Sequence, residues 1–372
     1  MKITTVAKTL MAGAAGFPLM AHAAGDGPGV QLYGVVDAGI ATTHTSGQGS
    51  HSGLLNGGLT DSLWGLRGSE DLGDGWSTRF QLESGFDPST GKRADDDRLF
   101  NYGAWVGLAH EAYGDLRLGR QYTVGKTYGN ALELASWKEM GMGATFKASD
   151  NYQFSNLVNY YTPTWQGFQA GIGYSFDADG RDRFQTATNN RAISLGLKYE
   201  DGPLLAVATW DQMRLAEPLA GNNGRPQAVQ LGASYDFEVV KVSLAWSRQR
   251  NGYVGLDGGD PDSLGQNLGP AAFARGGTVN AWLLGASVPV GHGAVVVQWS
   301  LANPDWKWDD GAKARNAQLV TLGYTYDLSP RTTLYAFAGY TSNYTLDNQF
   351  DPGHSHTCLL YTSPSPRDQR GS

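Results

Sequence analysis

Apolar and polar residues alternate along most of this chain. The alternation is clearest in four stretches, where apolar side chains take every second position and polar or small side chains lie between them: 168–176, 193–199, 240–247 and 320–326. Successive side chains of a β-strand point to opposite faces, so a period of two predicts strands with one apolar and one polar face. About fifteen such strand signals follow one another and predict an all-β, antiparallel protein.

The connections between these strands are alternately short and long. Short turns, rich in Gly, Pro and Asp, lie at 70–75, 110–114, 163–167, 200–203, 236–239, 289–293 and 327–331. Long polar segments lie at about 41–61, 86–98, 122–150, 177–189, 211–226, 250–276, 303–314 and 342–356. Short turns at one rim and long loops at the other are typical of a transmembrane β-barrel of the bacterial outer membrane. The alternative, a soluble β-sandwich, has only about seven to nine strands.

The N-terminus resembles a secretory signal peptide. Lys2 and Lys8 form a basic region, residues 10–20 form a short apolar region, and Ala21-His22-Ala23 supplies a small-x-small cleavage site. A buried N-terminal helix is the alternative, and the apolar run is too short to cross a bilayer. We therefore expect residues 1–23 to be a cleaved signal peptide and residues 24–356 to be an exported barrel.

Composition and motifs argue against several other functions. The formal net charge is −7, which disfavours a nucleic-acid partner, and the chain has one cysteine, Cys358, near its C-terminus. The aspartates of 255–262 lack the spacing of a calcium loop, and no helix follows Gly171-x-Gly173 as a dinucleotide site would require. We expect no enzyme activity, no cofactor and no metal. Aromatic residues at strand ends, such as Tyr33 and Trp76, suit an interfacial girdle or ordinary lipid-facing packing.

Five segments together resemble the general porins of Gram-negative bacteria: GVQLYGVVDAGI (29–40), SLWGLRGSEDLGDGW (62–76), FQLESGF (80–86), AWVGL (104–108) and LRLGRQYT (116–123). The resemblance extends over about 29–345. It implies a sixteen-stranded, homotrimeric barrel in the outer membrane, in contact with lipid and lipopolysaccharide. It also implies a water-filled channel for passive diffusion of ions and small hydrophilic solutes, narrowed by an inward-folded third loop. A barrel enzyme and a plugged structural or adhesive barrel are the alternatives.

Charged residues on the channel wall would bias ion flow. Arg67, Arg79 and Arg117 have inward parity in their strands, whereas only the resemblance assigns Arg98 and Arg120 to the same basic wall. The alternative for each arginine is an ordinary rim charge.

The third long segment, 122–150, is the expected constriction loop, and residues 130–140 have a helix-forming composition. The resemblance makes Glu133 and Glu139 the acidic side that faces the arginines. A solvated surface loop is the alternative. Tyr102 and Tyr152 stand where the family often has basic residues, which leaves anion or cation preference open.

The C-terminal tail differs from the rest of the chain. Barrels of this kind have an even number of strands, so the fifteen signals leave one strand missing. Residues 358–368 read CLLYTSPSPRD, which resembles the translation of a transposase adapter used in sequencing libraries. We interpret residues 357–372 as non-native and expect the last strand to be absent, with unpaired backbone groups on the strands near 30–42 and 332–342.

Overall fold

The computed structural model describes residues 29–45, 49–135, 140–142, 145–146, 153–180, 184, 186–216, 225–254, 271–308, 310–343 and 356–366, the last of these by its backbone. Eighteen antiparallel strands form one sheet. The strands are β1 (Gly29–Val35), β2 (Ala38–Thr45), β3 (Gly49–Asn56), β4 (Leu63–Gly73), β5 (Trp76–Gly85), β6 (Gly103–His110), β7 (Gly114–Tyr122), β8 (Gln153–Tyr161), β9 (Phe168–Ser175), β10 (Arg191–Asp201), β11 (Leu204–Arg214), β12 (Gln227–Asp236), β13 (Lys241–Arg250), β14 (Thr278–Val290), β15 (Gly293–Pro304), β16 (Ala317–Ser329), β17 (Thr332–Ser342) and β18 (His356–Pro366).

Within the described residues, four short helical segments lie between strands. They are the α-helices α1 (Val124–Gly129) and α2 (Ala271–Ala274) and the 3-10 turns η1 (Asn130–Leu132) and η3 (Thr186–Thr188). None of the helices in the described ranges is long and apolar enough to cross a membrane.

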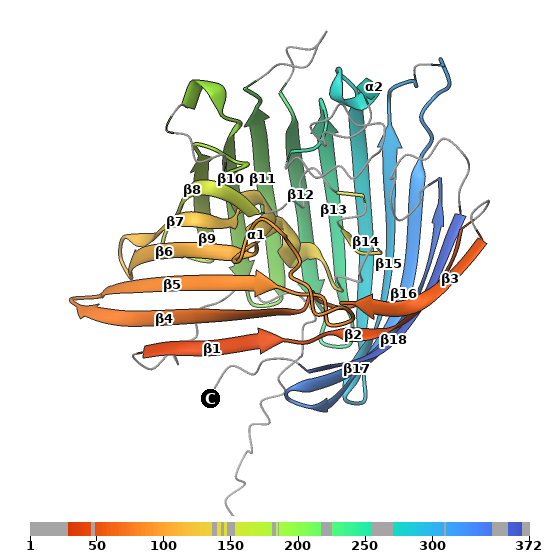
Figure 1. Ribbon diagram of the computed structural model, residues 1–372, viewed down its shortest axis with the longest axis horizontal. Coiled ribbons are helices and arrows are strands. Elements are labelled where there is room, and N and C mark those ends of the chain that lie inside the picture. Colours follow the sequence, from red (N-terminus) through yellow and green to blue (C-terminus); the bar gives the residue numbers. More distant parts are fainter. Residues whose placement is uncertain are drawn as a thin grey trace, which may run out of the picture.

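The strands confirm the predicted meander. From β4 to β18 each strand pairs with its neighbours in sequence, while β1 pairs with β4, and β2 pairs with β3 and β18. Because β1 continues into β2 and β3 into β4, these four segments are two interrupted strands, and β1 to β17 are the fifteen strands that were predicted. The predicted loop at 41–61 is wrong for most of its length, because β2 and β3 extend the first hairpin through it. In Figure 1, strands β4 to β7 run roughly horizontally and strands β10 to β16 run roughly vertically, with α1 drawn between the two groups.

The burial pattern is the reverse of that in a water-soluble protein. On β13 and β16 the apolar Leu244 and Leu322 are 53% and 54% exposed, whereas the polar Ser243 and Thr321 are fully buried. The apolar face is therefore the exposed outer face and the polar face is the buried inner one, the pattern that is typical of a transmembrane barrel. This arrangement follows directly from the two-residue period of the sequence.

The short turns lie where they were predicted. Between β4 and β5 only Asp74 and Gly75 separate the strands, and both have positive φ angles, 51° and 80°. This is the backbone of a type I′ turn, whose twist matches that of the flanking strands and which Asp-Gly favours.

The tail lies in the position of the missing strand. Residues 356–366 form β18, which pairs with β17 along its whole length and with β2 from Thr357 to Thr362. The expectation of unpaired edges near 30–42 and 332–342 is therefore wrong for β17 and for Ile40–Thr45 of β2, whereas β1 is in register only with β4 among the described strands.

A second connection between the two ends of the chain lies on the inner side. Asp37, in the break between β1 and β2, is fully buried, and its Oδ2 accepts hydrogen bonds from the N–H groups of Leu59 and Thr60, each at 3.0 Å. The Tyr335 hydroxyl of β17 donates to the other carboxyl oxygen, Oδ1. Asp37 thus organises the break between β3 and β4 and ties the first strand to β17 independently of β18.

We predict that Tyr335→Phe lowers the stability of the folded barrel by about 1–3 kcal/mol, because it leaves a buried acceptor without its hydroxyl donor. The temperature at which the folded form is lost in SDS electrophoresis measures this. Tyr326→Phe, on the outer face of β16, is the matched control and should change little. Equal losses in the two variants would contradict the role of Asp37.

Candidate functional site

The loop between β7 and β8, which we call loop 3, begins with a capped helix. Thr123 is the N-cap of α1, and its Oγ1 accepts a hydrogen bond from the N–H of Lys126 at 3.1 Å. The α-helix therefore occupies 124–129, before the stretch 130–140 whose composition favours a helix, and of that stretch residues 130–132 form the 3-10 turn η1. Of that stretch, residues 136–139 lie outside the described residues.

Polar side chains of the wall hold the backbone of loop 3 against the inner face of the sheet. Ser194 on β10 accepts from the N–H of Gly125 at 2.9 Å, and Gln298 on β15 donates to the carbonyl oxygen of Ala135 at 2.7 Å. Further contacts join Gln230 to Gly129, Ser243 to Leu132, Gln298 to Leu134 and Gln249 to Thr145. Loop 3 therefore runs sideways across strands β10 to β15 on the inner side of the sheet.

Apolar contacts complete this packing. Val124, Tyr128 and Leu132 of loop 3 are fully buried and belong to one cluster with wall residues such as Val207 and Leu283. The inner face of these strands is therefore covered by the protein's own loop, which explains why small and polar wall side chains are buried there.

The arginines lie on the strands and loops before loop 3. Arg67, on β4, donates from Nε to Gln31 at 2.9 Å, and its guanidinium lies over the Tyr33 ring at 4.9 Å. The Tyr33 hydroxyl in turn donates to Glu83 at 2.6 Å. Tyr33 is thus part of an inner-face cluster, so its assignment to an interfacial girdle is wrong. The hydrogen bond to Glu83 could not be read from the strand-end position of Tyr33.

Arg117, on β7, is enclosed by one aspartate and two aromatic rings, and its side chain is 20% exposed. It donates to Asp115 Oδ2 from Nε at 2.9 Å and from Nη2 at 2.6 Å. Its guanidinium also lies over the rings of Trp105 and Tyr161, at 4.8 and 5.2 Å. Asp115 therefore largely compensates its charge.

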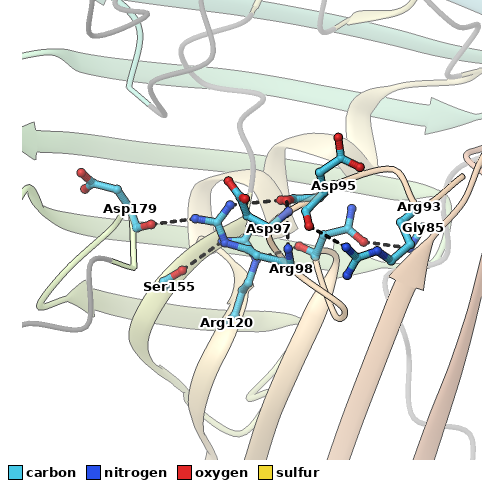
Figure 2. Close-up of polar contacts among 10 residues, drawn as sticks. Gly85, Arg93, Asp95, Asp97, Arg98, Arg120, Ser155 and Asp179 are labelled. Atoms are coloured by element: carbon cyan, nitrogen blue, oxygen red, sulfur yellow. Dashed lines mark hydrogen bonds and ion pairs between the residues drawn. The ribbon is translucent and has the colours of Figure 1, made fainter.

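Arg98 and Arg120 meet at the root of loop 3. Arg98 donates to Asp95 at 3.0 Å and to the carbonyl oxygen of Asp179 at 2.8 Å, so that it joins the loops that follow β5 and β9 (Figure 2). Arg120, on β7, donates to the carbonyl oxygen of Asn101 at 2.7 Å and to the Ser155 hydroxyl at 3.1 Å. The structure thus brings together the two arginines that only the resemblance had assigned to one wall.

The remaining predicted residues are more dispersed. Arg79 is half-buried on β5, opposite Ser69 and Gly107. Glu133 is 4% exposed, and its carboxyl accepts a hydrogen bond from the N–H of Met142, within loop 3 itself. Glu139 lies outside the described residues.

The ties between wall and loop were not predicted from the sequence. Period-two alternation places Ser194 and Ser243 on the inner face, but nothing in the sequence indicates that a loop 111 positions away, in the case of Ser243 and Leu132, would bind there. Glu83 shares the inward parity of Arg79, so its inner position did carry a signal.

Comparison with known proteins agrees with this geometry. The family model described as Gram-negative porin matches residues 7–346. The chain belongs to the Gram-negative porin family. It is 38% identical to an outer membrane porin protein of Bordetella pertussis, over 92% of this chain and 95% of that protein. It is also 33% identical to outer membrane porin protein 32 of Delftia acidovorans, over 84% of each chain.

Solved structures give the same result. The anion-selective porin from Comamonas acidovorans superposes with a TM-score of 0.71 and 27% identity, over 91% of this chain and 99% of that one. The porin described here is therefore an outer-membrane channel protein. In its described part, no group of His, Cys, Asp and Glu side chains could hold a metal ion.

The lowered pKa of Asp95 defines the pH range over which the ion pair between Asp95 and Arg98 persists. Burial raises this pKa, but the hydrogen bonds from the Arg98 side chain and from the N–H of Asp97 together lower it by more, so that it lies below the ordinary value. The stabilisation from this pair is present above the ordinary aspartate pKa of about 3.9 and is lost only as the pH falls through the lower pKa of the folded state.

We predict that the backbone amides of residues 93–100 keep the same protection against hydrogen exchange, relative to the intrinsic rate at each pH, from neutral pH down to about pH 4. Asp95→Asn should exchange roughly two- to fivefold faster at neutral pH, the effect of losing a partly exposed ion pair. Asp97→Asn is the control, because the Asp97 side chain does not take part in the pair. If Asp95→Asn exchanged like the control, the pair would not hold the loop.

Proposed function

We propose that this porin is a passive channel for ions and small hydrophilic solutes, and that loop 3, residues 122–150, forms its constriction. The observation that supports this is the row of hydrogen bonds from the wall to loop 3 across β10 to β15. Because the loop covers that part of the inner face, the free passage lies between it and the arginine-bearing strands β4 to β7. Solutes would pass by size, with a bias set by wall charges.

We further propose that the passage favours anions. Arg67 and Arg120 are hydrogen bonded to neutral groups, the side chain of Gln31 in one case and the carbonyl of Asn101 in the other. Arg98 and Arg117 are paired with aspartates, and Glu133 is buried in its loop. Among the described residues, neither arginine is hydrogen bonded to a carboxylate, although Glu83 lies near enough to Arg67, and Asp95 to Arg120, to interact with its charge. The structural relative from Comamonas acidovorans is described as anion-selective.

On this proposal Arg79 adds to the positive wall and Glu139 supplies the opposing acidic side. Opposed charges across a narrow passage orient dipolar solutes and disfavour apolar ones. The chain would then need no catalytic residue and no cofactor.

We propose a homotrimer, in contact with outer-membrane lipid and lipopolysaccharide. A structure of the Vibrio cholerae porin OmpT is described as a trimer form and shares the fold with a TM-score of 0.63. A high-molecular-weight band in unheated SDS electrophoresis would support the trimer, and a monomeric folded band would contradict it.

We also propose that residues 1–23 are removed on export and that residues 357–372 do not belong to the natural protein. Besides the resemblance to an adapter, β18 ends in Pro364 and Pro366, in a part of the strand that pairs with β17 alone because the pairing with β2 stops at Thr362. Proline has no N–H to donate to a ladder, so this end of β18 is poorly suited to be an inner strand of a closed barrel. Long-read sequencing of the source locus tests this, and an uninterrupted gene that encodes the same tail would refute it.

We predict that the purified porin forms conducting channels in planar bilayers, with a reversal potential of anionic sign in a salt gradient. Replacing Arg67 and Arg120 by Gln should lower the anion-to-cation permeability ratio by up to about sevenfold per charge, because a unit charge near 7 Å in water changes the free energies of the anion and the cation by roughly 0.6 kcal/mol in opposite directions.

Two controls make this prediction specific. Arg117→Gln should have a smaller effect because Asp115 already compensates that charge, and Arg331→Gln, in the turn before β17, should have none. A silent membrane would contradict the channel itself, whereas equal effects at Arg67 and Arg331 would contradict only the assignment of selectivity.

A further inference from the structure

We propose that inward-facing glycines of the wall form a seat for loop 3 and thereby set the free width of the channel. This inference rests on the proposed function, in which loop 3 forms the constriction. Glycine weakens a strand, and where it occurs there it often marks a place where another part of the chain approaches closely. Here the approaching group is loop 3.

Apolar side chains of loop 3 occupy the spaces that these glycines leave. A Cβ atom built on Gly196 of β10 would lie 2.6 Å from Tyr128 Cδ2 and 2.7 Å from Val124 Cγ1. One built on Gly339 of β17 would lie 2.8 Å from Met140 Sδ. In both cases the three nearest atoms all belong to loop 3. These glycines therefore leave room for the loop rather than for neighbouring strands.

The same relation recurs on other strands. A Cβ atom on Gly171 of β9 would lie 2.7 Å from Val124 Cγ1, and one on Gly285 of β14 would lie 3.0 Å from Leu134 Cδ1. The seat thus extends from β9 to β17, over the same wall as the hydrogen bonds to the loop backbone.

The fit is reciprocal, because loop 3 has glycines where the wall has large polar side chains. Gly125 lies against the Asp211 carboxyl of β11, which is 3% exposed. A Cβ atom on Gly129 would lie 2.6 Å from Gln230 Oε1 of β12. Side chains of loop 3 thus pack over glycines of the wall, and side chains of the wall pack over glycines of loop 3. This interlocked packing prevents the loop from shifting along the wall or moving closer to it.

A side chain added at one of these glycines should displace loop 3 away from the wall. Apolar atoms pack at about 3.5–4.0 Å, so a methyl group at Gly196 or Gly339 requires the loop atoms to retreat by about 1 Å. The strand backbone is fixed by pairing on both sides, and the loop is free to move only toward the passage. The channel should therefore become narrower on the side that faces the arginines.

The experiment compares Gly196→Ala and Gly339→Ala with Gly53→Ala, whose Cβ would meet no atom within 4 Å on β3. Single-channel conductance and the swelling of liposomes in sugars of increasing size are measured on the full chain. We expect the two seat variants to conduct roughly 10–30% less and to exclude larger sugars more strongly, while Gly53→Ala behaves as the unaltered porin.

A second variant separates this effect from general damage to the barrel. Adding Met140→Ala to Gly339→Ala removes the loop atoms that the new methyl group would meet, so it should restore the conductance. Unchanged conductance in Gly196→Ala and Gly339→Ala, or a change that Met140→Ala does not reverse, would overturn the inference.

Two further outcomes keep the test decisive. If Gly339→Ala does not insert, Gly285→Ala, with its milder contact to Leu134, is measured in its place and must show the same decrease. A silent unaltered porin would instead contradict the proposed function, so the two failures are distinguishable.

Discussion

Pairing of each strand with its neighbours is the constraint from which the other features of this porin follow. A strand that crosses hydrocarbon has no water to bind its N–H and C=O groups, so they must all be satisfied within the sheet. The ladder from β4 to β18 and the interrupted strands β1–β2 and β3–β4 supply most of these partners, while β1 is in register only with β4 among the described strands. Even the tail segment is drawn into the sheet as β18, because the edges of β2 and β17 would otherwise be open.

Because backbone groups pair with one another within the sheet, only side chains are left to line a channel. In a membrane barrel, every second side chain of a strand faces outward, toward lipid. The inner face is therefore the only place for polar chemistry, and it is divided between two tasks. Strands β9 to β17 carry glycines and small polar groups that hold loop 3. The strands and loops from β4 to β7 carry arginines, of which Arg98 and Arg117 are paired with aspartates. On the proposed function, this division places the loop and the arginines on opposite sides of the passage.

The strand count, the short turns and the two faces of each strand could be predicted from the sequence, because each depends only on local alternation and turn chemistry. Leu244 and Ser243, for example, lie on the faces that their parity indicates. Contacts between distant segments carry no such signal. The Tyr33 hydroxyl bond to Glu83, the burial of Glu133 and the tie from Asp37 to Tyr335 all depend on where the sheet places residues that are far apart in sequence.

The loops were the least predictable part of the chain. Composition favoured a helix at 130–140, but the N-cap Thr123 begins the α-helix before that stretch, and the helix ends at Gly129 with Asn130 as its C-cap. The segment 41–61 appeared polar enough for a loop, yet β2 and β3 pair through it, and the polar side chains of Thr42 and Ser52 and of His44 and Ser50 hydrogen bond across the hairpin.

Oxygen accessibility of spin labels in bilayers tests the two-faced strand most directly. Labels placed singly at Leu244 and Leu322, in a Cys358→Ser background, should be reached readily by dissolved oxygen, which concentrates in lipid. Labels at Ser234 and Thr321 should be shielded from it. If the polar positions proved to be the oxygen-accessible ones and the leucines the shielded ones, the inner and outer faces would be reversed and the channel described here could not exist.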